Sequence, residues 1–304
     1  MAITVERISY KGWTNCYLIG NGEMEVVVTT DVGPRVIRCG FTGKPNLFHE
    51  FPEQLGKTGG AEWQLYGGHR LWHSPESLDR TYWPDNAPVN VELLPDGVHL
   101  RQPMEPTTGI EKELLITMAA DRSQVRVEHR LTNRNCWELT FAPWAISVMK
   151  AGGTAIIPQN REPVGEGLLH NRILALWPYS EMNDPRVLWG SRYIRVNQDP
   201  TREQAFKFGI SAPEGWLAYQ HPDGLFVKEF PYQAAVTYPD GGVNAEVYTN
   251  NFFLEVESLG SLQTVAPGET VTHLETWSIY QNIPQFEEEA NIFQFFAKNV
   301  CNLA

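Results

Sequence analysis

Residues 216–227 have the sequence WLAYQHPDGLFV, and this stretch indicates the fold class. Two apolar runs, Trp216–Tyr219 and Leu225–Val227, stand on either side of Pro222-Asp223-Gly224. Proline presets the first dihedral angle of a turn and glycine accepts a positive φ. The segment therefore predicts two antiparallel strands joined by a tight turn.

Similar signals continue outward along the chain. Pro-Asp-Gly occurs again at 95–97 and 239–241, each time between apolar or alternating runs, and predicts two further hairpins. Apolar and charged residues alternate over Val125–Leu131, which indicates a strand with one exposed face. Strands are also expected at Phe253–Glu257 and Val271–Tyr280, on either side of an Ala-Pro-Gly-Glu turn. The chain is therefore predicted to be all-β, with large antiparallel sheets.

The chain is expected to end in a helix. Pro284 begins it, three glutamates occupy its first turns and Lys298 lies near its end, which suits the helix dipole. Its apolar stripe is expected to consist of Phe286, Ala290, Phe293, Ala297 and Val300. The sequence has no Gly/Ser/Pro-rich linker and no repeat of roughly 20–50 residues. Residues 1–304 are therefore expected to form a single domain.

Charge and hydropathy exclude several classes of partner. With 24 Lys and Arg against 36 Asp and Glu, the 304-residue chain has a formal net charge of −12 and no basic stripe for a phosphate backbone. The longest apolar stretch, Leu139–Met149, is shorter than the ~20 residues that cross a bilayer. Met1–Tyr10 has no apolar signal region. No nucleic-acid or membrane partner is expected, and the cytoplasm is the expected compartment.

Motifs for metals and cofactors are missing from the sequence. Its four cysteines form no CxxC pair, and neither HExxH nor an EF-hand loop occurs. A P-loop and GxGxxG are missing as well. The expectation is a site without metal or cofactor.

Residues 63–76, WQLYGGHRLWHSPE, are the first candidate for chemistry. In an extended strand, Arg70 and Trp72 would lie on one face, with His69 and His73 on the other. The guanidinium donor fork suits sugar hydroxyls, and an indole offers a flat apolar surface to a pyranose. Paired glycines at 67 and 68 would let the backbone approach a ligand. In the alternative interpretation, the tryptophan is a core residue and Arg70 pairs an acid such as Glu76.

Glu255 and Glu257 are the second candidate. They flank Val256, so both would point to one face of a strand, about 7 Å apart. Two carboxyls that close raise each other's pKa, which tunes a general base towards neutral pH. The alternatives are a solvated face or ion pairs with Arg or Lys on adjacent strands.

Further residues could complete a sugar site. Lys207, between two phenylalanines, could donate to a sugar hydroxyl, pair with one of these glutamates or simply be exposed. Tyr82, Trp83 and Asp85 belong to a loop that mixes aromatic and polar groups, as sugar clefts do. Such a loop could also pack over a sheet edge without binding a ligand.

Several separated motifs occur together: Trp63 with Tyr66–Trp72, Pro143-Trp144-Ala145, Tyr238–Gly242, Leu254–Gly260, and Pro267-Gly268-Glu269 with Glu275-Thr276-Trp277. They span nearly the whole chain and resemble a family of the galactose mutarotase-like superfamily. The resemblance implies a galactose mutarotase-like β-supersandwich whose curved sheet binds a monosaccharide or a sugar chain.

The resemblance also implies roles for residues. Glu255 would be the base that takes the anomeric proton, with Glu257 as second choice, and Arg70 would hold hydroxyls. His69 would protonate the ring oxygen, although a bulge after the paired glycines is needed to bring it to the face of Arg70. The implied activity is that of an aldose 1-epimerase without a cofactor. The alternatives are a non-catalytic sugar-binding protein and a lyase of acidic polysaccharides, which the acidic charge disfavours.

Overall fold

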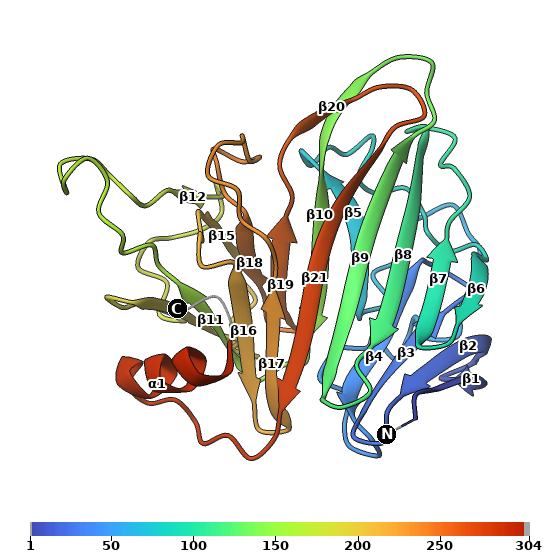
Figure 1. The fold of residues 1–304 in the computed structure, drawn as a ribbon, viewed down its shortest axis with the longest axis horizontal. Coiled ribbons are helices and arrows are strands. Elements are labelled where there is room, and N and C mark those ends of the chain that lie inside the picture. Colours follow the sequence, from blue (N-terminus) through green and yellow to red (C-terminus); the bar gives the residue numbers. More distant parts are fainter. Residues whose placement is uncertain (1, 301–304) are drawn as a thin grey trace.

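The computed structural model describes residues 2–300, and their strands form two large antiparallel sheets (Figure 1). Within these residues the first sheet has eleven strands, in the order β1 (Thr4–Tyr10), β2 (Trp13–Gly20), β3 (Met24–Thr29), β4 (Arg35–Phe41), β5 (His69–Ser74), β10 (Leu139–Met149), β19 (Leu254–Leu259), β18 (Ala245–Thr249), β15 (Phe206–Ile210) and β12 (Leu174–Leu176), with β20 (Gln263–Val265) paired to β10. The second has ten strands there, in the order β13 (Val187–Trp189), β14 (Tyr193–Asn197), β11 (Thr154–Pro158), β16 (Trp216–His221), β17 (Gly224–Glu229), β21 (Thr270–Tyr280), β9 (Gln124–Asn133), β8 (Ile110–Met118), β7 (Gly97–Arg101) and β6 (Asn90–Leu94).

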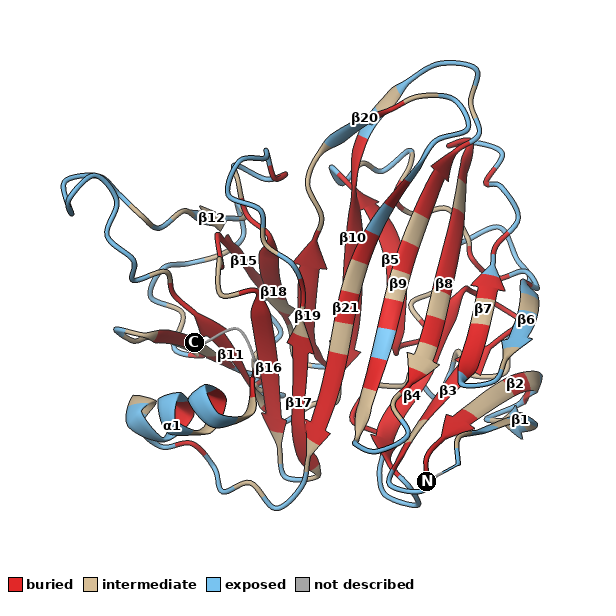
Figure 2. Ribbon diagram, in the orientation of Figure 1, coloured by how far each residue is buried: buried red, intermediate tan, exposed pale blue. Residues whose placement is uncertain are grey.

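The main hydrophobic core lies between the two sheets. Leu71 of β5 and Val256 of β19 belong to the same buried cluster as Val127 of β9 and Trp277 of β21. Figure 2 shows the central strands of both sheets as buried along most of their length. All residues of β5 and β19 are buried, since both faces of the first sheet are covered. The prediction of an all-β chain with large antiparallel sheets is confirmed.

Two of the three predicted Pro-Asp-Gly hairpins are confirmed. β16 pairs with β17 across Pro222-Asp223, and β6 pairs with β7 across Pro95-Asp96. The third prediction, at 239–241, is wrong. This turn lies in the long connection from β17 in the second sheet to β18 in the first, so the flanking strands do not pair with each other. The Pro-Asp-Gly sequence determines that the chain turns at this point. Which strand pairs with the one after the turn depends on strands that are distant in the sequence.

The C-terminal helix, α1 (Glu289–Asn299), begins five residues later than predicted. The side chain of Gln220 accepts a hydrogen bond from the backbone N–H of Phe286 at 3.0 Å and donates one to the carbonyl of Pro284 at 2.8 Å. These bonds hold the segment before the helix against β16, where it pairs with a side chain instead of forming a helical turn.

The predicted apolar stripe is correct for Phe286 and Val300, which are buried, and wrong for Ala290, Phe293 and Ala297, which are exposed. Within α1, the buried side chains are Ile292 and Phe296, and Phe296 stacks on Trp216 at 4.0 Å between ring centroids. Phe293, expected in the stripe, is 43% exposed. The helix therefore covers the outer face of the second sheet near β16 (Figure 1). None of the helices within residues 2–300 is long and apolar enough to span a membrane.

Candidate functional site

A cleft lies on the outer face of the first sheet, away from the main core. Every second side chain of β5, β10, β19, β18 and β15 points to this face of the sheet. Arg70 is in register with Ile146, which is in register with Glu257, and Glu255 is in register with Tyr248. The cleft has a volume of about 220 Å³ and is lined by Trp63, Leu65, Arg70, Trp72, Glu76, Tyr82, Trp144, Tyr179, Lys207, Tyr248, Phe253 and Glu255. We refer to it as the Arg70 cleft.

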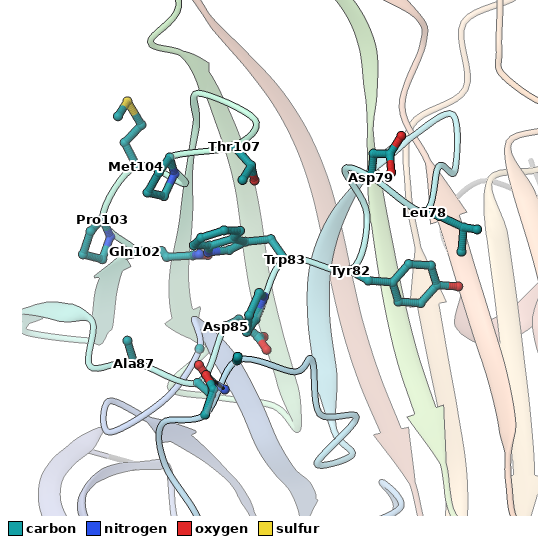
Figure 3. A pocket seen from close by; sticks show the side chains of 16 residues that line it. Leu78, Asp79, Tyr82, Trp83, Asp85, Ala87, Gln102, Pro103, Met104 and Thr107 are labelled. Carbon is teal, nitrogen blue, oxygen red and sulfur yellow. Dashed lines mark hydrogen bonds between the residues drawn. The ribbon is translucent and has the colours of Figure 1, made fainter.

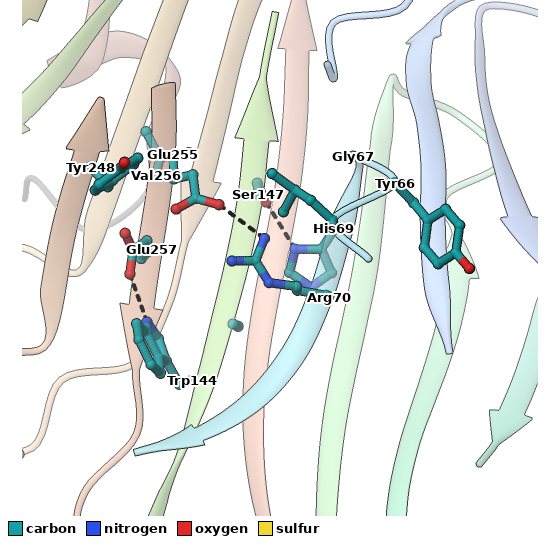
Figure 4. A network of polar contacts seen from close by, with 12 residues as sticks. Tyr66, Gly67, His69, Arg70, Trp144, Ser147, Tyr248, Glu255, Val256 and Glu257 are labelled. Atoms are coloured by element: carbon teal, nitrogen blue, oxygen red, sulfur yellow. Dashed lines mark hydrogen bonds and ion pairs between the residues drawn. The ribbon is translucent and has the colours of Figure 1, made fainter. Parts of the chain in front are cut away.

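An ion pair between Arg70 and Glu255 crosses the floor of the cleft (Figure 4). Nη1 of Arg70 donates to Oε1 of Glu255 at 2.9 Å, and both residues are more than nine-tenths buried. The guanidinium carbon lies 4.2 Å from the ring centroid of Trp72, a cation–π distance. Glu76, the other acid considered for this arginine, instead accepts a hydrogen bond from Tyr82 at 2.5 Å.

The environment of Glu255 favours a carboxyl that holds its proton more tightly than usual. Burial raises its pKa, the Arg70 guanidinium lowers it, and the neighbouring Glu257 raises it again. The result is a pKa above the ordinary glutamate value. Such a carboxylate is a stronger base than an exposed one.

Lys207 is fixed between two carboxylates and two indoles. Its Nζ lies 2.8 Å from Oε2 of Glu246 and 3.1 Å from Oε2 of Glu257. Nζ is also 4.5 and 4.6 Å from the ring centroids of Trp144 and Trp177. Burial opposes the charge, but the two glutamates outweigh it and raise the pKa of Lys207. The ammonium therefore remains charged beneath the cleft.

Glu257 and Glu246 lie behind the cleft wall. Glu257 accepts a hydrogen bond from Nε1 of Trp144 at 2.7 Å (Figure 4) and is fully buried. Glu246 lies opposite Glu257 in the β18–β19 register. Burial raises the pKa of Glu246 far above its ordinary value; Lys207 opposes this shift, and Glu257 adds to it. Glu246 and Glu257 thus share the Lys207 ammonium as their common cation.

The structure brings five of the predicted site residues together around one cleft: Arg70, Trp72, Tyr82, Lys207 and Glu255. Sequence reasoning missed Trp144, Tyr248 and Glu246 as site residues. Glu246 and Tyr248 carry the same period-two signal as Glu255 and Glu257, because they alternate with apolar residues in β18. Trp144 belongs to a wholly buried part of β10, where alternation is invisible.

His69 lies on the opposite face of β5 from Arg70. The β5–β10 register is unbroken from His69 to Ser74, so no bulge turns the ring towards the cleft. Its Nδ1 is 2.9 Å from Oγ of Ser147 and its Nε2 is 2.7 Å from Nε2 of His129, between the two sheets. Burial lowers the pKa of His69 well below its ordinary value. The expected acid therefore does not share a cavity with Glu255.

The paired glycines serve chain packing instead of ligand approach. A Cβ on Gly67 would lie 2.1 Å from the carbonyl oxygen of His49, and a Cβ on Gly68 would lie 2.2 Å from that of Val36. Both glycines have positive φ, 104° and 71°. They allow the chain before β5 to pack closely against β4 at Val36 and against the chain after β4 at His49.

Trp83 and Asp85 line a second hollow, of about 660 Å³ (Figure 3). Tyr82 borders both hollows, but its neighbour Trp83 points into the second one, beside Gln102 (Figure 3). Oδ2 of Asp85 accepts a hydrogen bond from the fully buried Arg35 at 2.6 Å. The structure thus places these two predicted residues outside the Arg70 cleft.

Among the described residues, His69, His129 and Glu275 form a group whose ligand atoms lie within 4.8 Å of one another. Ligands of this type can hold a transition metal. However, Nζ of the fully buried Lys228 lies 2.9 Å from Oε1 of Glu275 and already balances its charge. A further cation would meet this ammonium in a low-dielectric interior, which opposes metal binding.

Comparison with known proteins supports the fold. No family model matches this chain, and no curated protein matches its sequence. A protein described as a candidate aldose 1-epimerase, from Klebsiella pneumoniae, matches with a TM-score of 0.62 at 12% identity, over 91% of this chain and 83% of that chain. A galactose mutarotase related enzyme from Lactobacillus acidophilus matches with a TM-score of 0.52 at 9% identity, over 90% and 100%. A galactose mutarotase-like protein from Clostridium acetobutylicum matches with a TM-score of 0.51 at 11% identity, over 92% and 99%. The predicted galactose mutarotase-like fold is confirmed.

Proposed function

We propose that the Arg70 cleft binds a sugar and interconverts its anomers, as an aldose 1-epimerase does. The observation that carries the proposal is the position of Glu255, a carboxyl of raised pKa, on the floor of a small aromatic cleft. The half-buried Trp63 lines the cleft and offers apolar surface to the C–H side of a pyranose, whereas the buried rings of Trp72 and Trp144 face Arg70 and Lys207. Arg70 keeps the carboxylate ionised and in place through their hydrogen bond.

Anomer exchange needs a base at the anomeric hydroxyl and an acid at the ring oxygen. Glu255 takes the proton from the anomeric hydroxyl, the bond between C1 and the ring oxygen breaks, and an aldehyde forms at C1. The electron pair of that bond goes to the ring oxygen, which takes a proton from a neighbouring acid. Rotation about C1–C2 and reversal of these steps close the ring with the other configuration.

Tyr248 is the acid that we propose for this step. It is in register with Glu255 across β18 and β19, and its side chain lines the same cleft. Burial raises the pKa of its hydroxyl, so the group carries its proton at neutral pH. The charged Lys207, opposite Tyr248 in the β15–β18 register, would stabilise the phenolate that proton donation leaves behind.

The test follows anomer interconversion by proton NMR in freshly dissolved α-glucose, α-galactose and their 6-phosphates. Wild-type protein is expected to accelerate the exchange of at least one sugar. Glu255→Gln is expected to abolish the acceleration and keep the fold. Glu229→Gln serves as the control, because Glu229 is another partly buried glutamate with a raised pKa, at the end of β17 outside the cleft. Wild-type rates from Glu255→Gln would overturn the assignment of the base.

A non-catalytic sugar-binding protein is the second candidate. It is favoured by the lining of the Arg70 cleft, which includes no histidine among the described residues, and by the engagement of Glu255 with Arg70. If the protein only binds sugar, titration with sugar will change chemical shifts but will not accelerate anomer exchange. Trp72→Ala will then weaken sugar binding, and Glu255→Gln will leave the affinity nearly unchanged.

A further inference from the structure

A second hollow, of about 320 Å³, adjoins the Arg70 cleft. Glu76 and Trp144 line both. We call the second one the outer hollow, and its lining consists of Pro75, Glu76, Ser77, Leu78, Trp144, Trp177 and Asp240. Because two lining residues are common to both, the two hollows lie next to each other.

Trp177 stands at a fixed position in the outer hollow. It begins a turn in which the N–H of Ser180 donates to the carbonyl of Trp177 at 2.9 Å. Oγ of Ser180 donates to the carbonyl of Lys207 and accepts from its N–H, both at 2.7 Å. The same turn carries Tyr179, which lines the Arg70 cleft.

Lys207 also holds the indole rings of the two hollows relative to each other. Its ammonium lies 4.5 Å from the ring centroid of Trp144 and 4.6 Å from that of Trp177. Glu246 and Glu257 bind this ammonium from below. A half-buried Trp177 ring held in this way is a preorganised stacking surface, so little conformational entropy is lost when a ligand binds.

The charges of the outer hollow select against anions. Its ionisable lining residues within the described chain are the carboxylates Glu76 and Asp240, and it has no Lys, Arg or His there. Carboxylates accept hydrogen bonds from hydroxyls and repel phosphates and uronates. In the Arg70 cleft, both cations are already paired with glutamates.

We infer that the two hollows together bind the reducing end of a neutral oligosaccharide. The reducing-end ring lies beside Glu255, where its anomeric carbon meets the base, and the next ring stacks on Trp177. This inference rests on the proposed function for the location of the reducing end. It adds the substrate class: a neutral sugar of at least two rings, bound more tightly than a monosaccharide.

Calorimetric titration tests the inference with neutral disaccharides and their reducing-end monosaccharides. The pairs are maltose, cellobiose and lactose against glucose, mannobiose against mannose, and xylobiose against xylose. At least one disaccharide is expected to bind about tenfold more tightly than its monosaccharide, a gain of about 1.4 kcal/mol from the ring on Trp177. Glucose 6-phosphate and glucuronate are expected to bind more weakly than glucose.

Trp177→Ala is expected to remove the tenfold gain and leave monosaccharide affinity unchanged. Trp137→Ala is the control, because Trp137 is 62% exposed and lines neither hollow. Equal affinity of every disaccharide and its monosaccharide would overturn the inference, as would a Trp177→Ala variant that weakens both equally or neither.

The two proposals fail in different ways. Monosaccharide binding with anomer exchange but no disaccharide gain would overturn only the inference of a second ring. A gain that depends on Trp177, without anomer exchange in any sugar, would overturn only the epimerase activity. Lack of binding by every probe would overturn both.

Discussion

Replacement of Arg70 by methionine tests the electrostatics of the cleft independently of any activity. Methionine keeps much of the apolar stem and removes the guanidinium that hydrogen-bonds to Glu255 at 2.9 Å. Glu255 then remains in a buried site without its closest cation. Because Arg70 lowers the pKa of Glu255, the substitution raises this pKa further above its ordinary value.

The expected magnitude follows from the burial of the pair. Breaking a buried ion pair by removal of one partner costs about 3–5 kcal/mol of the free energy of unfolding. For a chain of 304 residues, an unfolding entropy of about 2.1 cal/mol/K per residue turns this loss into a fall in Tm of about 5–8 °C. The loss includes the cation–π contact of Arg70 with Trp72, which does not depend on pH.

The sign of the pH dependence follows from the raised pKa. A carboxyl whose pKa is higher in the folded state than in the unfolded state destabilises the fold as pH rises above the unfolded value, about 4.3 for glutamate. The stability gap between Arg70→Met and wild type is therefore expected to be smallest near pH 5 and to widen towards pH 8. Thermal unfolding at both pH values measures it.

The double variant Arg70→Met/Glu255→Gln is the matched control. Because it has no carboxylate to desolvate, its deficit relative to wild type is expected to be smaller than that of Arg70→Met at pH 8 and not to widen between pH 5 and pH 8. A single variant with the same deficit at pH 5 and pH 8, or a double variant as unstable as the single one at pH 8, would refute the reasoning.

Two further substitutions test the framework that supports the site. Lys228→Met leaves Glu275 buried without its partner at 2.9 Å and is expected to lower the stability by about 3 kcal/mol or more in urea unfolding, with partial recovery in Lys228→Met/Glu275→Gln. Equal loss in both variants would contradict the pairing. Gly68→Ala places a Cβ 2.2 Å from the carbonyl oxygen of Val36 at a φ of 71°, so the soluble yield or Tm should fall strongly. Gly43→Ala has a similar φ of 70°, but no atom lies within 4 Å of the added Cβ, so its Tm should fall less. Equal falls in Tm would show that backbone strain, and not the contact with Val36, causes the loss of stability.

Local patterning predicted much of this protein correctly. Pro-Asp-Gly turns at 95–97 and 222–224 identified two hairpins, because turn chemistry acts within a few residues. Alternation placed Arg70 on the face of β5 opposite His69, as observed. The sequence signals for the start of the helix were misleading. Gln220 hydrogen-bonds to the backbone of Pro284 and Phe286, so α1 begins after this segment.

Alternation along the sequence is enough to predict which side chains share a face of a strand, as with Glu255 and Glu257. The order of the strands, which places Arg70 within 2.9 Å of a glutamate 185 residues away, depends on the folded chain. The folded chain also determines that Lys207 pairs with Glu246, and that loops bury these charges and shift their pKa values. Alternation is a local property of the backbone, whereas strand order and burial arise from contacts between distant segments. Desolvation and ion pairing exist only after those contacts form.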